Sequence, residues 1–197
     1  MHHAVRGHEN PALDTAVAIG NHRGLPVVAY QGLGGSHRFS NDRHYTFILE
    51  GARDAHAEIE KLGVCTAFNL PLDKNDTSPL SSLLERAAVI VTDEFPVPPM
   101  GEWMQLHARR APVTMIAVDA SCLVPMRLQP QRFDRAYAFR LHNAAEFEKR
   151  VRRLWPTVRP QAKRYEGELG FDPLDLDEAD IAALVARCPI DHSVPPV

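Results

Sequence analysis

The residue types best suited to chemistry gather after two apolar runs of the sequence. Thr92, Asp93 and Glu94 follow one run directly, and Asp119 follows the next. Because the carboxyl ends of parallel strands meet at one edge of a sheet, we expect these side chains to lie at a common crest. Grouped carboxylates can bind a metal or exchange protons, but aspartate is also a preferred cap and turn residue. We favour the capping role and expect no catalysis from this group.

A glycine-rich loop follows another apolar run at 26–30. Its glycines, Gly32, Gly34 and Gly35, would let backbone amides approach an anion or a flat chromophore. Their spacing matches neither the dinucleotide GxGxxG fingerprint nor a phosphate loop with its lysine and hydroxyl. A plain flexible turn is therefore as good an interpretation as a ligand cradle.

Polar residues at the start of the next amphipathic segment complete the candidate pocket. Asn41 precedes apolar residues at helical spacing, which predicts that it caps a long helix. Arg43 and His44 then fall in the first turn, where helix amides and a cation offer positive potential to a carboxylate or phosphate. His44 could equally be a solvated first-turn residue. The expected crest pocket is lined by Tyr30, Gly32, Gly34, Gly35, Asn41, Arg43, His44, Thr92, Asp93, Glu94 and Asp119.

Other reactive residue types lack the spacing of a working site. The 10 histidines include no HExxH pattern, and the 3 cysteines include no CxxC pattern. We expect no metal centre, no disulfide framework, and free thiols in a reducing compartment. The serines lie in no nucleophile-elbow motif, so nucleophilic hydrolysis is not expected.

The elements that position these residues alternate between strand and helix. Apolar runs without polar alternation are typical of strands covered on both faces, and they predict strands at 26–30, 64–69, 88–92 and 113–118. Caps and amphipathic patterns predict helices at 10–24, 41–62, 78–87, 103–110, 133–155 and 178–186. This alternation predicts an α/β fold, a Rossmann-like doubly wound and mostly parallel sheet with helices on both faces.

Composition bounds the domain organisation and the environment. A chain of 197 residues with 45% hydrophobic content fits one domain, which we place at 1–155. The proline- and acid-rich residues 156–197 should form a tail packed over that domain or a linker. A net charge of -3 predicts no general attraction to nucleic acid or an anionic membrane. We expect a cytoplasmic protein, because no apolar run has the length of a membrane span or signal core.

Arginines crowd the segment 127–164, near Tyr137, Phe139 and Trp155. Arginines beside aromatic residues outline a nucleic-acid surface. Acidic residues are interspersed in the same helical pattern, however, and mixed charges are usual on solvated helix faces. We favour the solvated face.

Five stretches resemble the N-terminal α/β domain of DNA photolyases and cryptochromes, in particular the class II cyclobutane pyrimidine dimer photolyases, and a sixth is similar to the segment with which those enzymes pass into their helical flavin domain. They are ENPALDTA (9–16), LPVVAYQGL (25–33), SNDRHYTFILEG (40–51), AAVIVTDEFP (87–96), VDASCLVPM (118–126) and DHSVPPV (191–197). The order and spacing of these stretches span nearly the whole chain. The family also has a strand before the segment similar to residues 1–10, so the resemblance implies truncation there or a strand formed by residues 2–5.

The resemblance implies a part of a light-driven lyase and not a complete one. In this family the flavin and the lesion-binding surface belong to a helical domain that this chain lacks, so FAD and DNA would be bound only if that domain were supplied in cis or in trans. The α/β domain of the family holds an antenna chromophore of the folate or deazaflavin type, and no tightly bound cofactor is expected in this chain alone. The alternative is a stand-alone enzyme, or a protein that binds nucleotides or small molecules, that reuses the fold.

Overall fold

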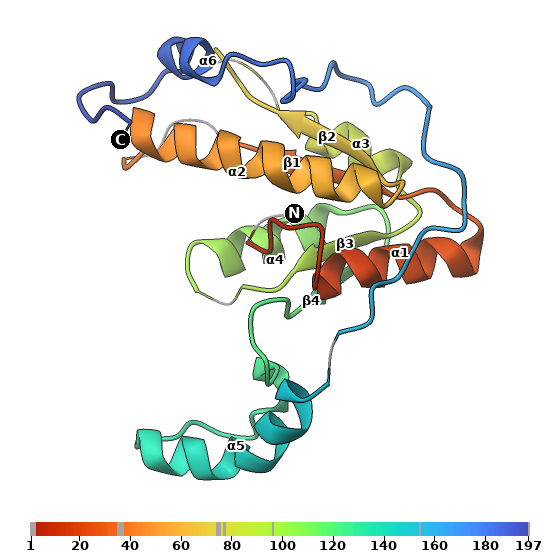
Figure 1. The fold of residues 1–197 in the computed structure, drawn as a ribbon, viewed down its shortest axis with the longest axis vertical. Helices are drawn as coiled ribbons and strands as arrows, with labels where there is room; N and C mark the ends of the chain where they lie inside the picture. The colour runs from red at the N-terminus through yellow and green to blue at the C-terminus, as the bar shows by residue number, and fades with distance from the viewer. Residues whose placement is uncertain are drawn as a thin grey trace.

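Helices and strands alternate along the chain. The computed structural model describes residues 3–34, 38–73, 76, 78–95, 97–153 and 155–196. In chain order the elements are α1 (Pro11–Arg23), β1 (Val28–Gly32), α2 (Asp42–Lys61), β2 (Cys65–Asn69), α3 (Leu80–Arg86), β3 (Ile90–Asp93), α4 (Met100–Arg110), β4 (Met115–Val118), the 3-10 turn η1 (Met126–Leu128), α5 (Ala136–Val151) and α6 (Ile181–Arg187) (Figure 1). Each predicted strand overlaps an observed one, and the α/β class is confirmed.

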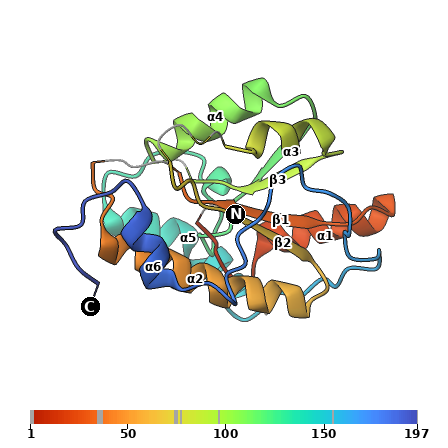
Figure 2. The ribbon, with the colours of Figure 1, turned by 90° about the horizontal axis from the view of Figure 1, so that it is seen from above.

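The strands form two parallel pairs. In one pair β1 lies beside β2 with Tyr30 opposite Ala67, and in the other β3 lies beside β4 with Thr92 opposite Ala117. Figure 2 shows α3 and α4 on one side of the strands and α2 and α6 on the other. The described part of the chain therefore has the predicted parallel, helix-flanked strands, but it divides them between two sheets and does not join them in one.

Local capping explains where the two longest N-terminal helices begin and end. The Asn10 side chain accepts hydrogen bonds from the amides of Ala12 and Leu13, and Gly24 ends α1 with φ of 67°. Asn41 caps α2 by accepting from the amide of His44, and Gly63 follows that helix with φ of 89°. The left-handed conformation is one that glycine adopts without strain, so the predicted helix stops are confirmed.

The proline-rich C-terminal segment, residues 156–196, runs back over the body and supplies part of the core. Leu176 and Val185 pack with Leu49 and Phe68 in one buried cluster, and the amide of Leu174 donates to the Phe68 carbonyl at 2.9 Å. The start of this segment is held at α1, where the Asp14 carboxylate accepts hydrogen bonds from the Trp155 indole and the Val158 amide, at 2.6 and 2.9 Å. This segment is an integral layer over α2 and β2.

Some parts of the fold are less enclosed than their apolar sequences predict. Most residues of β3 and all residues of β4 are only half-buried, although both apolar runs predict strands covered on both faces.

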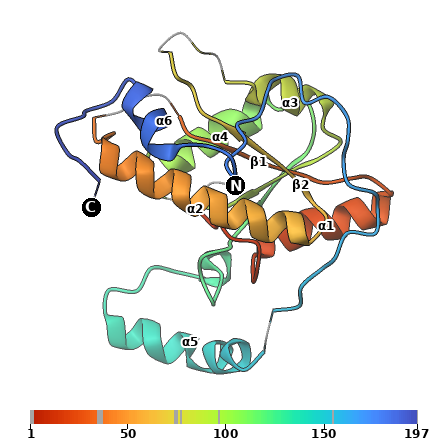
Figure 3. The ribbon, with the colours of Figure 1, turned by 45° about the horizontal axis from the view of Figure 1, so that its top comes forward.

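The strand that the resemblance implied at residues 2–5 is not seen. His2 lies outside the described residues, and residues 3–5 adopt no strand. Figures 1 and 3 both show α5 set apart from the two strand pairs. Among the described helices, none is both long and apolar enough to cross a bilayer.

Candidate functional site

The carboxyl end of β1 carries the aromatic part of the predicted crest. A Cβ added to Gly32 would lie 2.6 Å from the Tyr30 hydroxyl oxygen, so that hydroxyl rests against bare backbone. The Tyr30 ring meets Phe171 edge-on, with centroids 6.1 Å apart. Burial raises the pKa of Tyr30, and a hydrogen bond with Ser78 offsets this only in part. Tyr30 therefore presents a protonated hydroxyl at neutral pH.

The glycine loop is joined to α2 by a second tyrosine. The Tyr45 hydroxyl donates to the carbonyl oxygen of Gly34 at 3.1 Å. Burial raises the pKa of Tyr45, against a smaller opposing effect of its hydrogen bond with Ser40, so it also stays protonated. Gly34 is exposed and a Cβ there would meet no atom, whereas Gly35 lies outside the described residues.

The first turn of α2 contacts the end of the C-terminal segment. The Arg43 amide donates to the Val194 carbonyl and its guanidinium to the Pro195 carbonyl, both at 3.3 Å. Beside it, the His192 ring nitrogen Nδ1 lies within hydrogen-bond distance of the Asp42 carboxylate, at 2.6 Å. His44 is half-buried and lies edge-on to Tyr45. Arg43 thus reaches the C-terminal segment, and any ligand at this helix end would lie next to residues 191–196.

Asp93 anchors the beginning of the chain. Its buried carboxylate accepts hydrogen bonds from the backbone amides of His3 and Ala4, the latter at 2.8 Å. Burial alone raises the pKa of Asp93, but the N–H groups of Ala4 and His3 outweigh it and hold the pKa below its usual value. The carboxylate is therefore ionised at neutral pH and fixes residues 3–4 at the end of β3.

The other two crest carboxylates also have structural partners. Asp119 accepts from three backbone amides, those of Ser121, Cys122 and Met126, at 3.1, 2.9 and 2.9 Å. Burial raises the pKa of Asp119, but the hydrogen bonds from these amides lower it by more, so the pKa lies below its usual value. The Arg127 guanidinium forms a bidentate ion pair with the Glu94 carboxylate, in which Nη2 and Oε1 are 2.8 Å apart. The contacts of Asp119 fit the capping interpretation, whereas Glu94 is held by an ion pair that this interpretation did not include.

Carboxylate pairing at the crest leaves few open ligand groups. Thr92 is half-buried in β3, one residue before Asp93. Within the described ranges, no three histidine, cysteine, aspartate or glutamate side chains gather closely enough to hold a metal ion. A ligand role for Thr92, Asp93, Glu94 and Asp119 stays a prediction.

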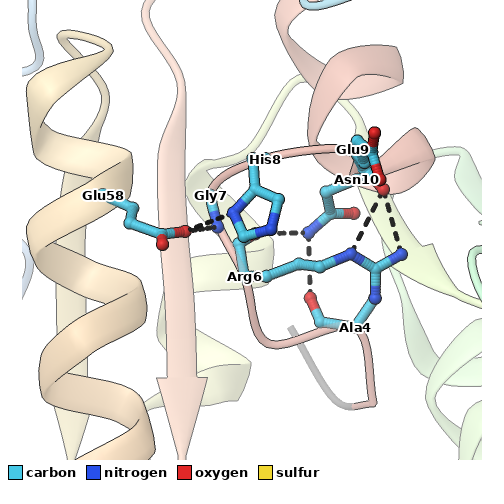
Figure 4. A network of polar contacts seen from close by, with 7 residues as sticks. All are labelled: Ala4, Arg6, Gly7, His8, Glu9, Asn10 and Glu58. Atoms are coloured by element: carbon cyan, nitrogen blue, oxygen red, sulfur yellow. Dashed lines mark hydrogen bonds and ion pairs between the residues drawn. The ribbon is translucent and has the colours of Figure 1, made fainter. Parts of the chain in front are cut away.

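A polar network around the first residues was not foreseen from the sequence (Figure 4). The side-chain amide of Asn10 donates hydrogen bonds to the backbone carbonyls of Ala4 and Arg6, at 2.8 and 2.9 Å. The Gly7 amide and the His8 ring both contact one carboxylate oxygen of Glu58 at 2.9 Å. These contacts lower the pKa of Glu58, with the His8 hydrogen bond as the largest cause. The segment therefore bridges α2, through Glu58, to the end of β3.

Gln31 and His56 are buried polar residues whose hydrogen-bonding capacity is not fully used. Gln31, near the end of β1, is 7% exposed, and its amide oxygen has no partner among the described residues. His56 of α2 lies edge-on to Phe68, and its Nε2 likewise has no described partner. Burial lowers the pKa of His56 to about 4. A buried acceptor without a partner costs roughly 1–3 kcal/mol, so Gln31 is a strong addition to the crest.

Gln31 carries a sequence signal that the crest prediction did not use. It lies on the buried face of β1 with Ala29, where an apolar residue is the norm.

Two surface hollows lie away from the crest, one of about 280 Å³ beside α6 and one of about 420 Å³. The larger is lined by Gln131, Arg132, Phe133, Asp134, Arg135 and Ala138.

Comparison with known proteins supports one relationship. No family model matches the chain. The deoxyribodipyrimidine photo-lyase of Methanothermobacter thermautotrophicus is 26% identical to it over 184 residues. The match covers 92% of this chain and 37% of that protein, so the chain spans little more than a third of its curated relative. Over nearly its whole length, then, the chain is similar to part of a photolyase, which is consistent with a photolyase-like N-terminal domain.

Proposed function

We propose that this chain is the α/β module of a light-driven DNA-repair lyase of the photolyase kind, related to the class II branch. The observation that carries the proposal is the match to a deoxyribodipyrimidine photo-lyase over 92% of this chain but only 37% of that protein. The module binds an antenna chromophore or acts as a scaffold, and it performs no repair alone. Its partner is a helical flavin domain in cis or in trans, through which DNA is bound.

The crest at the end of β1 is the proposed chromophore site. A flat heteroaromatic ring needs apolar cover and a few placed polar groups. On one face of β1 the Tyr30 hydroxyl lies against Gly32, and on the opposite face Gln31 offers a buried amide oxygen without a described partner. In this proposal the N–H edge of a folate or deazaflavin ring donates to the Gln31 oxygen, and the Tyr30 ring gives apolar cover at the end of the strand. Any acidic tail of such a ligand would lie toward Arg43 and the first turn of α2.

Tight binding of FAD by this chain alone is not expected. A ligand of that size needs most of its surface enclosed, and the photolyase family encloses its flavin within a separate helical domain. The flavin therefore belongs with the helical partner.

A fluorescence titration with a methenyl folate and with a deazaflavin tests the proposed site. Saturable binding of one of them is expected. Gly32→Ala should weaken that binding at least fivefold, because its Cβ would lie 2.6 Å from the Tyr30 hydroxyl and displace it. Gly51→Ala is the matched control, since a Cβ at this exposed position of α2 would meet no atom.

Each outcome of the titration is informative. Equal affinity in the Gly32→Ala and Gly51→Ala variants would move the site away from the crest. Absence of binding to both compounds would refute the antenna role and leave the scaffold role alone.

A further inference from the structure

Positive charge is concentrated in one segment of the chain, residues 127–164, which we call the basic arm. The arm carries 11 lysines and arginines against 3 aspartates and glutamates, whereas the rest of the chain carries 11 against 22. The residues that follow, 166–180, include seven carboxylates and no lysine or arginine. The net charge of -3 is therefore the sum of one strongly basic segment and an acidic remainder.

The basic arm and the acidic segment 166–180 are separated in space. Figures 1 and 3 show α5, which belongs to the arm, at one end of the molecule and α6, into which residues 166–180 lead, at the other. At 0.1 M salt the Debye length is about 10 Å, so acidic residues at the far end do little to reduce the potential of the arm. The arm therefore presents a positive surface of its own to the solvent.

Several contacts fix the basic arm to the body and to itself. Arg127 is paired with the carboxylate that follows β3, and the Trp155 indole donates to Asp14 of α1 at 2.6 Å. Between these two points, the buried side chain of Asn143 in α5 exchanges hydrogen bonds with Gln129, at 2.8 and 3.2 Å. The charges of the arm are thus carried by a positioned helix and not by a loose tail.

Most cations of the arm are not neutralised within the fold. Five of them lie within ion-pair distance of a carboxylate, including Lys149 and Arg150, which share Glu146. The interspersed carboxylates that favoured a solvated helix face are therefore too few to balance the charge. The remaining six cations are exposed and have no ion-pair partner in the described part of the chain: Arg135, Arg140, Arg152, Arg153, Arg159 and Lys163.

We propose that the basic arm binds the phosphate backbone of duplex DNA, with α5 along the major groove. The major groove of B-DNA is about 12 Å wide and admits an α-helix, which then has phosphates on both sides. Arg140 and Lys149 are nine residues apart in α5, or two and a half turns, so they project from opposite sides of the helix. Cations on both sides of one exposed helix match this arrangement of phosphates.

This inference goes beyond the proposed function, in which DNA is bound only through the helical partner. It does not depend on the chromophore site, because no residue of the basic arm lies at the crest except through the pairing of Arg127 with Glu94. It gives this chain a contact with DNA of its own.

The distribution of charge on α5 favours DNA over a lipid surface. A helix that lies in a membrane interface has one apolar face and a separate basic face. On α5, the exposed apolar residues Tyr137 and Leu141 share their side of the helix with Glu148, which comes 11 residues, or about three turns, after Tyr137. Insertion of that side would bring a carboxylate into an anionic surface. Duplex RNA is also a poorer fit, because its major groove is too narrow for side chains to enter.

Backbone contacts determine the expected affinity and its dependence on salt. Binding of this kind has no sequence preference, and its dissociation constant near physiological salt is roughly 1–100 µM. Contacts between about four of the free cations and phosphates would make the logarithm of the affinity fall with the logarithm of the salt concentration, with a slope of about −3.6.

Fluorescence anisotropy of a labelled, undamaged duplex of about 20 base pairs, which is two turns of DNA, tests the proposal with the full chain. The wild type should bind with the affinity and salt dependence given above. Arg152→Glu combined with Arg153→Glu should weaken binding at least tenfold at 0.1 M salt. The matched control is Arg109→Glu combined with Arg110→Glu, an exposed arginine pair at the end of α4. It lowers the net charge by the same amount and should change the affinity less than threefold.

Other results would overturn the inference. Absence of binding at 0.1 M salt, or an equal loss in the two double variants, would exclude the basic arm as the binding surface. An affinity that does not change with salt would exclude phosphate contacts. Tighter binding to a single strand than to the duplex would exclude the groove, and binding to phosphatidylserine vesicles but not to DNA would assign the arm to a membrane. Because the assay contains no chromophore, flavin or lesion, any of these results would leave the proposed function standing.

Discussion

Replacing Asp93 should destabilise the fold, because this carboxylate holds the N-terminal segment at the end of β3. Asp93 is 5% exposed and accepts the backbone amides of His3 and Ala4. A hydrogen bond to a charged group contributes about 1.5–3 kcal/mol, and a buried donor left unpaired costs about 1–3 kcal/mol. For Asp93→Ala we expect a loss of about 2–4 kcal/mol in the free energy of unfolding. Asp93→Asn, which keeps one acceptor oxygen, should lose about half as much.

Urea unfolding at pH 7, followed by circular dichroism, measures this loss. Asp172→Asn is the control, because it makes the same chemical change at an exposed position. The pKa of Asp93 is depressed in the fold, so its contribution is present above the unfolded-state pKa of about 3.9 and lost as the pH falls through the lower folded pKa. Acid unfolding should accordingly begin at higher pH in Asp93→Asn. Equal stability of the Asp93 and Asp172 variants would refute the anchoring role.

Two further predictions concern buried positions. Burial lowers the pKa of His56 to about 4 from an ordinary 6.5. As the pH is lowered from 6.5 to 4, the unfolded chain therefore takes up a proton that the folded chain does not, and the free energy of unfolding should decrease. His56→Leu should flatten this dependence in urea unfolding at pH 7 and pH 5, and an unchanged slope would contradict it. Gly7→Ala should destabilise by about 1–3 kcal/mol, because its Cβ would lie 2.5 Å from the Glu58 Cβ and 2.9 Å from the Ile59 amide. Gly51→Ala should be neutral or stabilising in the same thermal melt, and similar melting temperatures for the two would contradict the close approach.

Features governed by neighbouring residues could be predicted from the sequence. Asn10 and Asn41 cap their helices and Gly24 and Gly63 follow them as expected, because each of these roles depends on backbone groups within a few residues. The turn at Asp119 belongs with them, since all three of its partner amides lie within seven residues.

Features that depend on distant residues could not be predicted in the same way. The strand pattern indicates four parallel strands, but hydrophobic periodicity does not say which edges pair, so the division into two sheets was missed. The partners of Asp93 are 89 and 90 positions away in the sequence, and Glu58 is about 50 from Gly7 and His8. A local pattern shows only that such residues are polar.

In the candidate site too, contacts between neighbouring residues could be predicted from the sequence and contacts between distant residues could not. Tyr30 and Gly32 were predicted from the loop that follows an apolar run, and the structure adds that they touch. Arg43 was expected to face a ligand, but its contacts with Val194 and Pro195 join residues about 150 positions apart. Its proposed role toward an anionic ligand stays a prediction beside that contact.

Illumination of the purified chain tests the central claim most directly. The chain is mixed with FAD and a reductant, and then with an oligonucleotide that contains a cyclobutane thymine dimer. An α/β module without the flavin half should show no stoichiometric flavin absorbance after gel filtration and no light-dependent loss of the dimer. A bound flavin at one equivalent, or repair by this chain alone, would contradict the account.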